Sequence, residues 1–215
     1  MAGDLGLRER KKLRTRHALI EAALRLFAEK GYDETTLAEI AATVEVSPRT
    51  FFSYFATKED VIFFDSRTRL DESLAMIAER RPGETAAELM LRVVEHGLIS
   101  AATPADRAVR LSVTRVHLIM SVPALQARAL HVLVDGQRRL AEALHRAYPE
   151  ELGLVEASAI VGALVGAPTI TAMALLDRGD PPDQVWAAAR QALTIAVEGL
   201  RSAGPPSRRP PSAEP

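Results

Sequence analysis

Five polar side chains between residues 36 and 53 are of types that could bind a nucleic acid: Thr36, Ser47, Arg49, Thr50 and Ser53. Arg49 is expected near the start of a short helix, where its guanidinium could bind O6 and N7 of a guanine. Its alternative roles are a phosphate contact and a surface salt bridge. Thr50 and Ser53 could touch bases or thymine methyl groups. Thr36 and Ser47 could hold phosphates through their hydroxyls and the helix starts that they cap.

Two short helices are predicted to carry these side chains. Thr36 is followed three residues later by Glu39, which is the capping-box signature of a helix start. Ser47 is a second N-cap, and Pro48 takes the first helical position, where a missing N–H costs nothing. Two helices separated by about three residues form a helix-turn-helix, whose second helix lies in the major groove.

An ordinary helical hairpin is the alternative to this interpretation, and an aromatic cluster argues against it. The chain has ten Phe, Trp and Tyr residues, and four of them lie between Phe51 and Phe55. One short helix cannot bury them all. We expect Phe51 and Phe55 to belong to the core, and Thr57 begins another helix directly after them.

The N-terminus is a basic arm in a chain that is otherwise acidic. Residues 1–16 contain six basic and two acidic residues, so they carry +4, and the rest of the chain carries −5 within a total of −1. A basic arm beside a helix-turn-helix indicates a local DNA-binding face. Arg14 and Arg16 are its candidate phosphate contacts. The alternative is a solvated charged surface.

Composition excludes several other functions. The 215 residues include no cysteine, so disulfides, Cys-based zinc sites and thiol catalysis are excluded, and a reducing cytoplasm is favoured. No signal peptide is visible, because the first 16 residues are charged. Residues 157–176 are long enough to span a membrane, but a buried helix in a helical interface fits them better. Phosphate-binding loops, HExxH pairs and nucleophile elbows are absent from the sequence, so we expect neither an enzyme nor a cofactor.

Helical patterns follow one another along the chain and predict an all-α fold of about nine helices. Gly31 should end the first helix in a left-handed conformation, and Pro168 should kink or split the eighth. The expected domains are 1–58, with the basic arm and helix-turn-helix; 59–203, for effector binding and dimerisation; and 204–215, a disordered tail. The expected helices lie at about 13–30, 37–44, 48–55, 58–80, 84–100, 104–122, 123–148, 154–178 and 183–202.

Small residues recur in the last two expected helices. Small side chains let helices approach closely, so two such helices from each of two subunits would form a four-helix dimer interface. The alternative is packing within one subunit. The candidate interface residues are Gly162, Gly166, Ala188, Ala192 and Ala196.

With these features in place, residues 18–62 resemble the TetR family of bacterial transcriptional regulators. The matching sequence is ALIEAALRLFAEKGYDETTLAEIAATVEVSPRTFFSYFATKEDVI. The resemblance implies a homodimeric repressor that a small-molecule effector releases from a palindromic operator. Tyr54 and Lys58 match the family's phosphate-binding positions. The remaining residues are similar to the family only in helix number and length.

Three residues depart from the family's pattern. Glu45 stands where members usually have Gly in the turn, so either it is strained in a left-handed conformation or the turn shifts. Pro48, counted among the DNA-facing positions, replaces a side chain that often touches a base, so Arg49 takes more of the sequence reading. Phe52 stands where members often have Tyr, and a phosphate bond is lost there.

The resemblance also implies an effector held between the fourth and eighth helices. The apolar character of this region favours a hydrophobic or amphipathic ligand. A metal site formed by His96, His117 and His131 is disfavoured, because no carboxylate joins them at a ligand spacing. An enzyme on a helical scaffold and an effector-independent architectural protein remain alternatives. The candidate ligand contacts are Met90, His96, Arg115, His117, Met120 and Gln137.

Overall fold

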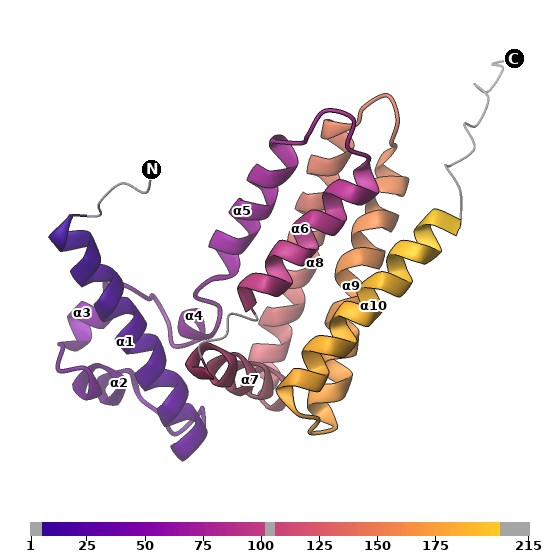
Figure 1. Ribbon diagram of the computed structural model, residues 1–215. Helices are drawn as coiled ribbons and strands as arrows, with labels where there is room; N and C mark the ends of the chain where they lie inside the picture. Colours follow the sequence, from indigo (N-terminus) through magenta and orange to yellow (C-terminus); the bar gives the residue numbers. More distant parts are fainter. Residues whose placement is uncertain (1–5, 102–105, 203–215) are drawn as a thin grey trace, which may run out of the picture. The chain divides into compact units, whose positions relative to one another are not determined.

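The computed structural model describes residues 6–101 and 106–202, of which 98–101, 106–113 and 182 are described by backbone alone (Figure 1). All regular elements in these ranges are α-helices, so the all-α prediction is confirmed. Their bounds are α1 Leu7–Lys30, α2 Leu37–Thr43, α3 Pro48–Phe52, α4 Glu59–Ile62, α5 Ser66–Ala78, α6 Ala86–Ala101, α7 Asp106–Ser121, α8 Pro123–Ala147, α9 Leu154–Asp177 and α10 Pro182–Ser202.

Two helices differ from the expectation. The described residues form ten helices rather than about nine, because a turn at residues 63–65 divides the expected fourth helix into α4 and α5. Helix α1 begins at Leu7 instead of Leu13, so much of the basic arm is helical. Pro168 lies inside the single helix α9, which is not split. The expected tail, 204–215, and the expected start of a helix near Pro104 lie outside the described residues.

The chain divides into two compact units. The first consists of Met1–Arg69 and Thr103–Val132, and the second of Leu70–Ala102 and Leu133–Pro215. This division differs from the expected boundary between residues 58 and 59. The reason is that the segment containing α7 and the start of α8 packs with the N-terminal helices, although it lies far from them in sequence.

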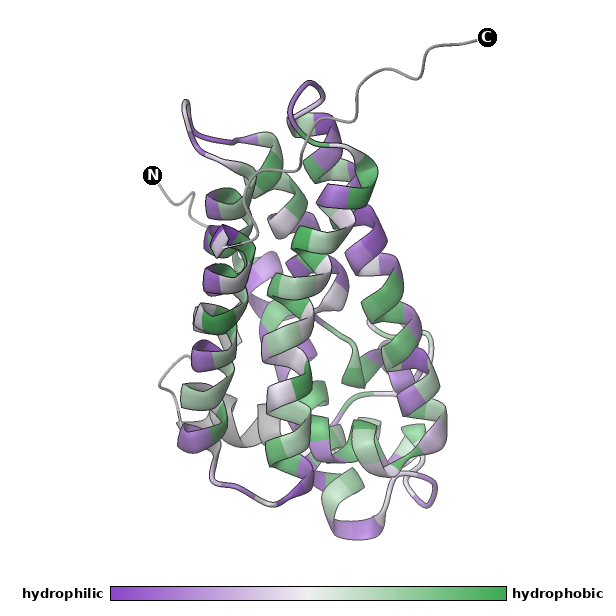
Figure 2. Ribbon diagram, turned by 90° about the vertical axis from the view of Figure 1, so that its right-hand side faces the viewer, coloured by the Kyte–Doolittle hydropathy of each residue, from purple (hydrophilic) through white to green (hydrophobic). Residues whose placement is uncertain are grey.

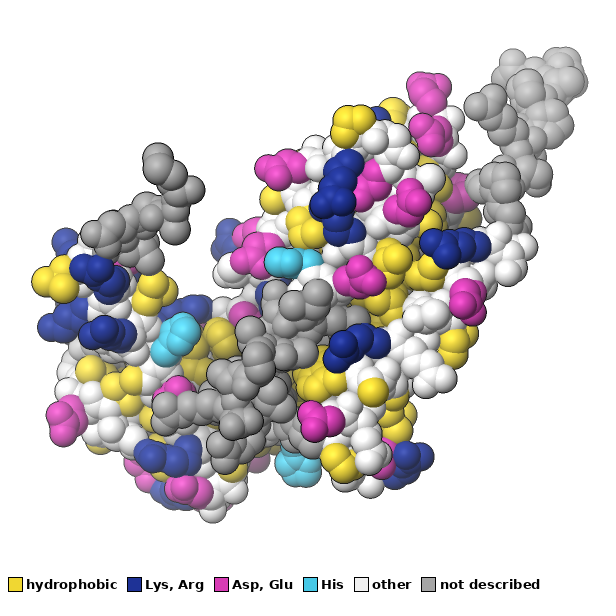
Figure 3. Space-filling view, in the orientation of Figure 1, with side chains coloured by type: hydrophobic (Ala, Val, Ile, Leu, Met, Phe, Trp, Pro, Cys, Tyr) yellow, Lys and Arg dark blue, Asp and Glu magenta, His cyan; other side chains and the backbone are white. Residues whose placement is uncertain are grey.

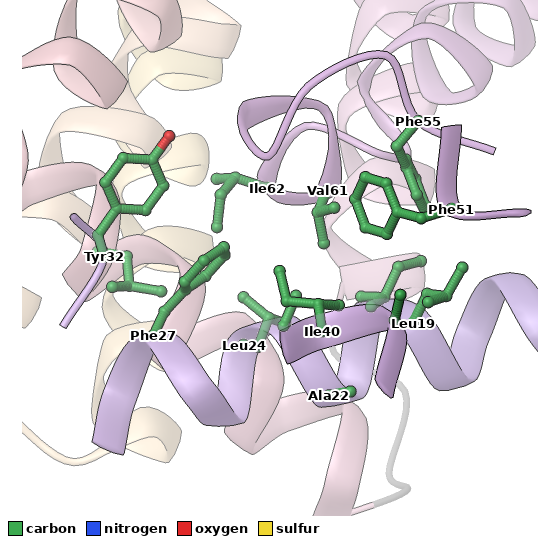
Figure 4. Close-up of a cluster of buried hydrophobic side chains, with 14 of the residues drawn as sticks. Leu19, Ala22, Leu24, Phe27, Tyr32, Ile40, Phe51, Phe55, Val61 and Ile62 are labelled. Atoms are coloured by element: carbon green, nitrogen blue, oxygen red, sulfur yellow. The ribbon is translucent and has the colours of Figure 1, made fainter. Parts of the chain in front are cut away.

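The core of the first unit lies between α1 and the short helices that follow it. Helix α1 buries a stripe at positions i, i+3, i+4 and i+7, formed by Ile20, Ala23, Leu24 and Phe27. Phe51 of α3 is fully buried against this stripe, and Phe55 is 4% exposed, as their expected core positions require. Figure 4 shows the main contributors to this core: Leu19, Leu24, Phe27, Tyr32, Ile40, Phe51, Phe55, Val61 and Ile62.

The second unit has its own core between α6, α8, α9 and α10. Met90 and Leu89 of α6 are fully buried there, together with Leu144 of α8. Helix α9 contributes Val161 and Leu164 from one face. The opposite face of α9 is exposed, as described below.

A Schellman motif connects α2 to α3. The amide of Val46 donates to the Ala41 carbonyl, and the amide of Glu45 donates to the Ala42 carbonyl, both at 3.0 Å. Glu45 occupies the position of this motif that requires a left-handed backbone, and its φ is 56°. The turn therefore keeps the geometry that glycine would favour, and Glu45 carries the strain of a Cβ atom in it.

Arg16 of α1 holds the turn between α4 and α5. Its Nη2 donates a 2.7 Å hydrogen bond to the carbonyl of Phe64. The same guanidinium lies 5.5 Å from the ring centroid of Phe55 and 5.7 Å from that of Phe64, which are cation–π distances. Arg16 is thus bonded inside the unit, whereas the sequence placed it among the phosphate contacts.

Two further arginines hold the same region from α7 and α8. Arg115 donates a 2.8 Å hydrogen bond to Asp65 Oδ1, and its guanidinium lies 5.3 Å from the Phe64 ring centroid. Arg128 pairs with Asp60. These contacts join segments about 50 to 70 residues apart in the first unit. We refer to the group as the arginine-held turn, which consists of Arg16, Arg115, Arg128 and residues 63–65.

Replacing Glu45 with glycine should stabilise the protein. We expect the free energy of unfolding to rise by up to about 1 kcal/mol, because glycine adopts a positive φ without the Cβ penalty but loses more chain entropy. Urea unfolding at fixed protein concentration measures the change. Glu45→Ala is the matched control, since it removes the charge but keeps the Cβ. Equal midpoints for the two variants would show that strain at this turn is not limiting.

Arg16 and Arg14 should differ in their effect on stability. Arg16→Ala removes a charge-assisted hydrogen bond and two ring contacts, so we expect a loss of about 1–3 kcal/mol. Arg14 is exposed on the same helix, and Arg14→Ala should change stability by less than about 0.5 kcal/mol. Thermal or urea unfolding of both variants decides the matter. A similar loss of stability in both variants would mean that the contacts of Arg16 in the arginine-held turn do not specifically stabilise the protein.

Candidate nucleic-acid interface

The predicted capping box at the start of α2 is confirmed. Thr36 Oγ1 accepts a 3.2 Å hydrogen bond from the Glu39 amide, and the Glu39 carboxylate accepts a 2.9 Å bond from the Thr36 amide. Lys30 of α1 pairs with the same carboxylate. The bond from Lys30, followed by those from Thr36, lowers the pKa of Glu39 to about 2. Thr36 thus serves first to fix α2.

Ser47 caps α3 as predicted, with Pro48 at the first helical position. Ser47 Oγ accepts a 3.1 Å hydrogen bond from the Thr50 amide and lies 2.9 Å from Thr50 Oγ1. Ser53 Oγ donates a 2.6 Å bond to the Thr50 carbonyl. The hydroxyls of Ser47, Thr50 and Ser53, three of those expected to contact DNA, are therefore already partnered within α3 and its two capping residues.

Helix α3 has one buried side and one exposed side. Phe51 and the following Phe55 are buried in the core, which fixes the rotation of the helix about its axis. Arg49 and Phe52 are three positions apart, so they share the opposite side, and both are exposed. Among the described residues, nothing forms an ion pair or hydrogen bond with the Arg49 guanidinium. The predicted base-reading residue is thus available on the surface.

Lys58 and Tyr54 are more enclosed than expected. Lys58 Nζ donates a 2.9 Å hydrogen bond to the Tyr32 carbonyl and lies 4.1 Å from the centroid of the Tyr32 ring. The Tyr32 hydroxyl in turn donates a 2.7 Å bond to Glu59 Oε1, and burial together with Glu59 raises the pKa of Tyr32. Tyr54 is half-buried against the core. Lys58 and Tyr32 are 26 residues apart in the sequence, and no local sequence pattern predicts their contact.

The basic arm is largely the first turns of α1. Its basic side chains between residues 8 and 14 are exposed, and Figure 3 shows them gathered over this end of the helix. Leu7, at 79% exposure, and Leu13, at 42%, lie among them. The arm thus presents a helical array of positive charge. Its exposed basic residues are Arg8, Arg10, Lys11, Lys12 and Arg14.

Three of the candidate effector contacts lie in the first unit. Arg115 is bonded to Asp65 in the arginine-held turn. His117 is exposed, and Met120 is partly buried. The structure therefore gives Arg115 a structural partner that the sequence did not show.

The other three candidates lie in the second unit. Met90 is fully buried in its core, so its sulfur fills space between helices. His96 is exposed, with its Nε2 3.9 Å from Glu72 Oε2, and Gln137 is partly buried. Within the described residues, no three His, Cys, Asp or Glu side chains are grouped closely enough to hold a metal ion.

The candidate dimer residues lie on α9 and α10, which pack against each other. Val161 and Leu164 point into the core, whereas Gly162 and Gly166 face open space, where an added Cβ would meet nothing within 4 Å. Val155 at 79% and Ile170 at 62% exposure extend the outer face of α9. Figure 2 shows hydrophobic residues along the length of α9.

Among the described residues, much of this outer face of α9 remains exposed. Only 17% of its most apolar stretch is buried, and by length and composition alone α9 could cross a membrane. In the described part of the chain, one bent pair, Thr114–Ser121 with Pro123–Ala147, also meets that test. The small candidates on α10, Ala188, Ala192 and Ala196, are each half-buried.

Comparison with known proteins gives a family match to the N-terminal helices. Residues 19–63 match the model described as bacterial regulatory proteins, tetR family. The chain is 38% identical over 144 residues to the transcriptional regulator TcmR of Streptomyces glaucescens, covering 63% of this chain and 61% of TcmR. It is 41% identical over 56 residues to HbdR of Aromatoleum sp. (strain CIB), covering 26% of this chain and 24% of HbdR. The chain thus matches less than two thirds of the length of either relative.

Solved structures show the same fold over most of the chain. The SmeT–triclosan complex is 17% identical, covers 86% of this chain and 91% of SmeT, and has a TM-score of 0.61. The fatty acid degradation regulator FadR from Bacillus halodurans is 22% identical, covers 87% of this chain and 96% of FadR, and has a TM-score of 0.56. The helix-turn-helix region, residues 19–63, thus belongs to the TetR family of bacterial regulatory proteins, and the chain shares its fold with SmeT and FadR over most of its length.

Proposed function

We propose that this protein is a transcriptional repressor that binds a palindromic operator as a homodimer. The observation that carries the proposal is the exposed Arg49, which has no ion-pair or hydrogen-bond partner among the described residues, on a helix that the Ser47 cap and the buried Phe51 and Phe55 hold in place. A guanidinium presented in this way suits bidentate contact with guanine in the major groove. The basic turns of α1 supply positive charge for the phosphates. Such a regulator would act in the bacterial cytoplasm.

A dimer is proposed because one short recognition helix reads too few base pairs to specify a genomic site. Two copies on a two-fold axis double the contacts and require an inverted repeat in the DNA. The exposed apolar face of α9 is the surface that suits this pairing, since its glycines allow close approach of a second helix. Helix α9 packs one side against α10 and leaves an apolar side exposed. This arrangement fits a four-helix interface between two subunits.

We further propose that a small hydrophobic or amphipathic effector releases the protein from DNA. The support is by analogy with the fold, because SmeT was solved in complex with triclosan and the similar FadR is a fatty acid degradation regulator. The effector must bind a conformation with altered recognition helices more tightly than the DNA-bound one. Weaker operator binding at saturating effector, with unchanged binding to random DNA, is the expected sign.

Arg49→Ala should weaken specific DNA binding by about 1–3 kcal/mol and relax the preference at one base pair in each half-site. The comparison uses the best-bound duplex selected from random sequences and a scrambled duplex of equal length, in a salt titration. Lys12→Ala is the matched control, because this exposed residue should contact only phosphate and reduce the salt slope by about 1. Equal losses on both duplexes for Arg49→Ala would remove its base-reading role.

Gly166→Arg should separate the subunits. A charged side chain in the middle of the apolar α9 interface would be buried without a partner. Sedimentation should give twice the mass of one chain for the wild type and the mass of one chain for the variant. Gly136→Arg on α8 is the control, since an added Cβ there also meets open space, and it should remain dimeric. A monomeric wild type that binds its operator tightly at micromolar concentration would contradict the model.

A further inference from the structure

Phe52 is an aromatic side chain left in water on the DNA-facing side of α3. It is 55% exposed, whereas Phe51 beside it is fully buried and Phe55 nearly so. The rings of Phe51 and Phe52 meet edge to face, with centroids 6.0 Å apart, so Phe51 supports Phe52 without covering it. In α2 and α3, both fully described, Phe52 is the sole large hydrophobic residue that is exposed. Its position is unfavourable in the free protein.

Few polar side chains near Phe52 on α3 remain available to contact DNA bases. The hydroxyls of Ser47, Thr50 and Ser53 are already engaged in bonds within α3. Phe52 itself has no hydrogen-bond donor, so it cannot bind a phosphate through its side chain. The exposed side of α3 therefore offers one charged fork, Arg49, and one apolar surface next to it.

We propose that Phe52 is a specificity-determining residue that contacts the C5 methyl group of a thymine in the major groove. This inference rests on the proposed function, because it requires the exposed side of α3 to enter the groove. The thymine methyl is the apolar feature that a base pair presents there, and an aromatic ring is a suitable partner for it. Contact would also remove the exposed ring from water.

The spacing of the two side chains gives the expected position of this thymine. Residues three apart on a helix are separated by about 4.5 Å along its axis, and successive base pairs by about 3.4 Å. The thymine should therefore lie one or two base pairs from the guanine bound by Arg49. Arg49 and Phe52 together would read a guanine and a neighbouring thymine in each half-site.

Replacing thymine with deoxyuridine tests the proposal, because it removes only the methyl group and keeps base pairing. The probe is the best-bound duplex selected by the wild type from random sequences, with each thymine replaced in turn. We expect wild-type affinity to fall about fourfold at one thymine per half-site, the effect of one buried methyl group. The other replacements should change affinity much less.

Variants of Phe52 test whether this side chain causes the loss of affinity for the deoxyuridine duplex. Phe52→Ala should bind the thymine and deoxyuridine duplexes equally, and Phe52→Leu, which keeps an apolar surface, should retain part of the difference. Arg49→Ala should keep the deoxyuridine penalty while losing affinity. Both Phe52 variants should fold, because this ring is exposed, and unfolding midpoints check this.

Two results would overturn the inference without touching the proposed function: selective DNA binding without a deoxyuridine penalty, or an equal penalty in the wild type and Phe52→Ala. An even loss of affinity on all duplexes for Phe52→Ala would also overturn it, since that indicates backbone contact. If the wild type prefers no duplex over random DNA, the proposed function fails, and this inference fails with it.

Discussion

The proposed DNA-facing surface depends on the burial of Phe51 and Phe55. Helix α3 has five residues, too few for a helix to persist in water by itself. Its position is therefore set by packing, and Phe51 and Phe55 fasten it to the core formed by α1 and Ile40 of α2. Because these two aromatics point inward, the rotation of α3 follows, and Arg49 and Phe52 must point outward. The apolar core thus determines which side chains of α3 point outward, toward the proposed DNA groove.

Polar groups in this region divide into those that build the structure and those that remain for a partner. The hydroxyls of Thr36 and Ser47 satisfy helix starts, and Lys58 is bonded to the Tyr32 carbonyl. A short helix has many unsatisfied backbone groups for its length, so its capping residues are engaged first. What remains exposed is Arg49, together with the positive charge along the first turns of α1. In the proposed function, a few exposed residues would therefore provide most of the discrimination between DNA sequences.

The sequence predicted local features well and distant contacts poorly. The caps at Thr36 and Ser47 and the core positions of Phe51 and Phe55 depend on residues a few positions apart, and the structure confirms them. The turn at residues 63–65 interrupts a continuous helical pattern, and the bonds that hold it come from residues 48 to 68 positions away. No periodicity encodes such partners. The same applies to the association of α7 with the N-terminal helices, which crosses the expected domain boundary.

The arginine-held turn gives the first unit a physical link between its DNA-facing helices and the segment from 103 to 132. Arg16 belongs to α1, which carries the basic surface, and it binds the same Phe64 that lies under Arg115 of α7. Asp60, which accepts bonds from the amides of Ala56 and Thr57 after the recognition helix, also pairs with Arg128. A displacement of α7 or of the start of α8 therefore cannot leave these bonds unchanged. If an effector moves that segment, the DNA-facing helices share the energetic cost, which is the differential interaction that a population shift requires.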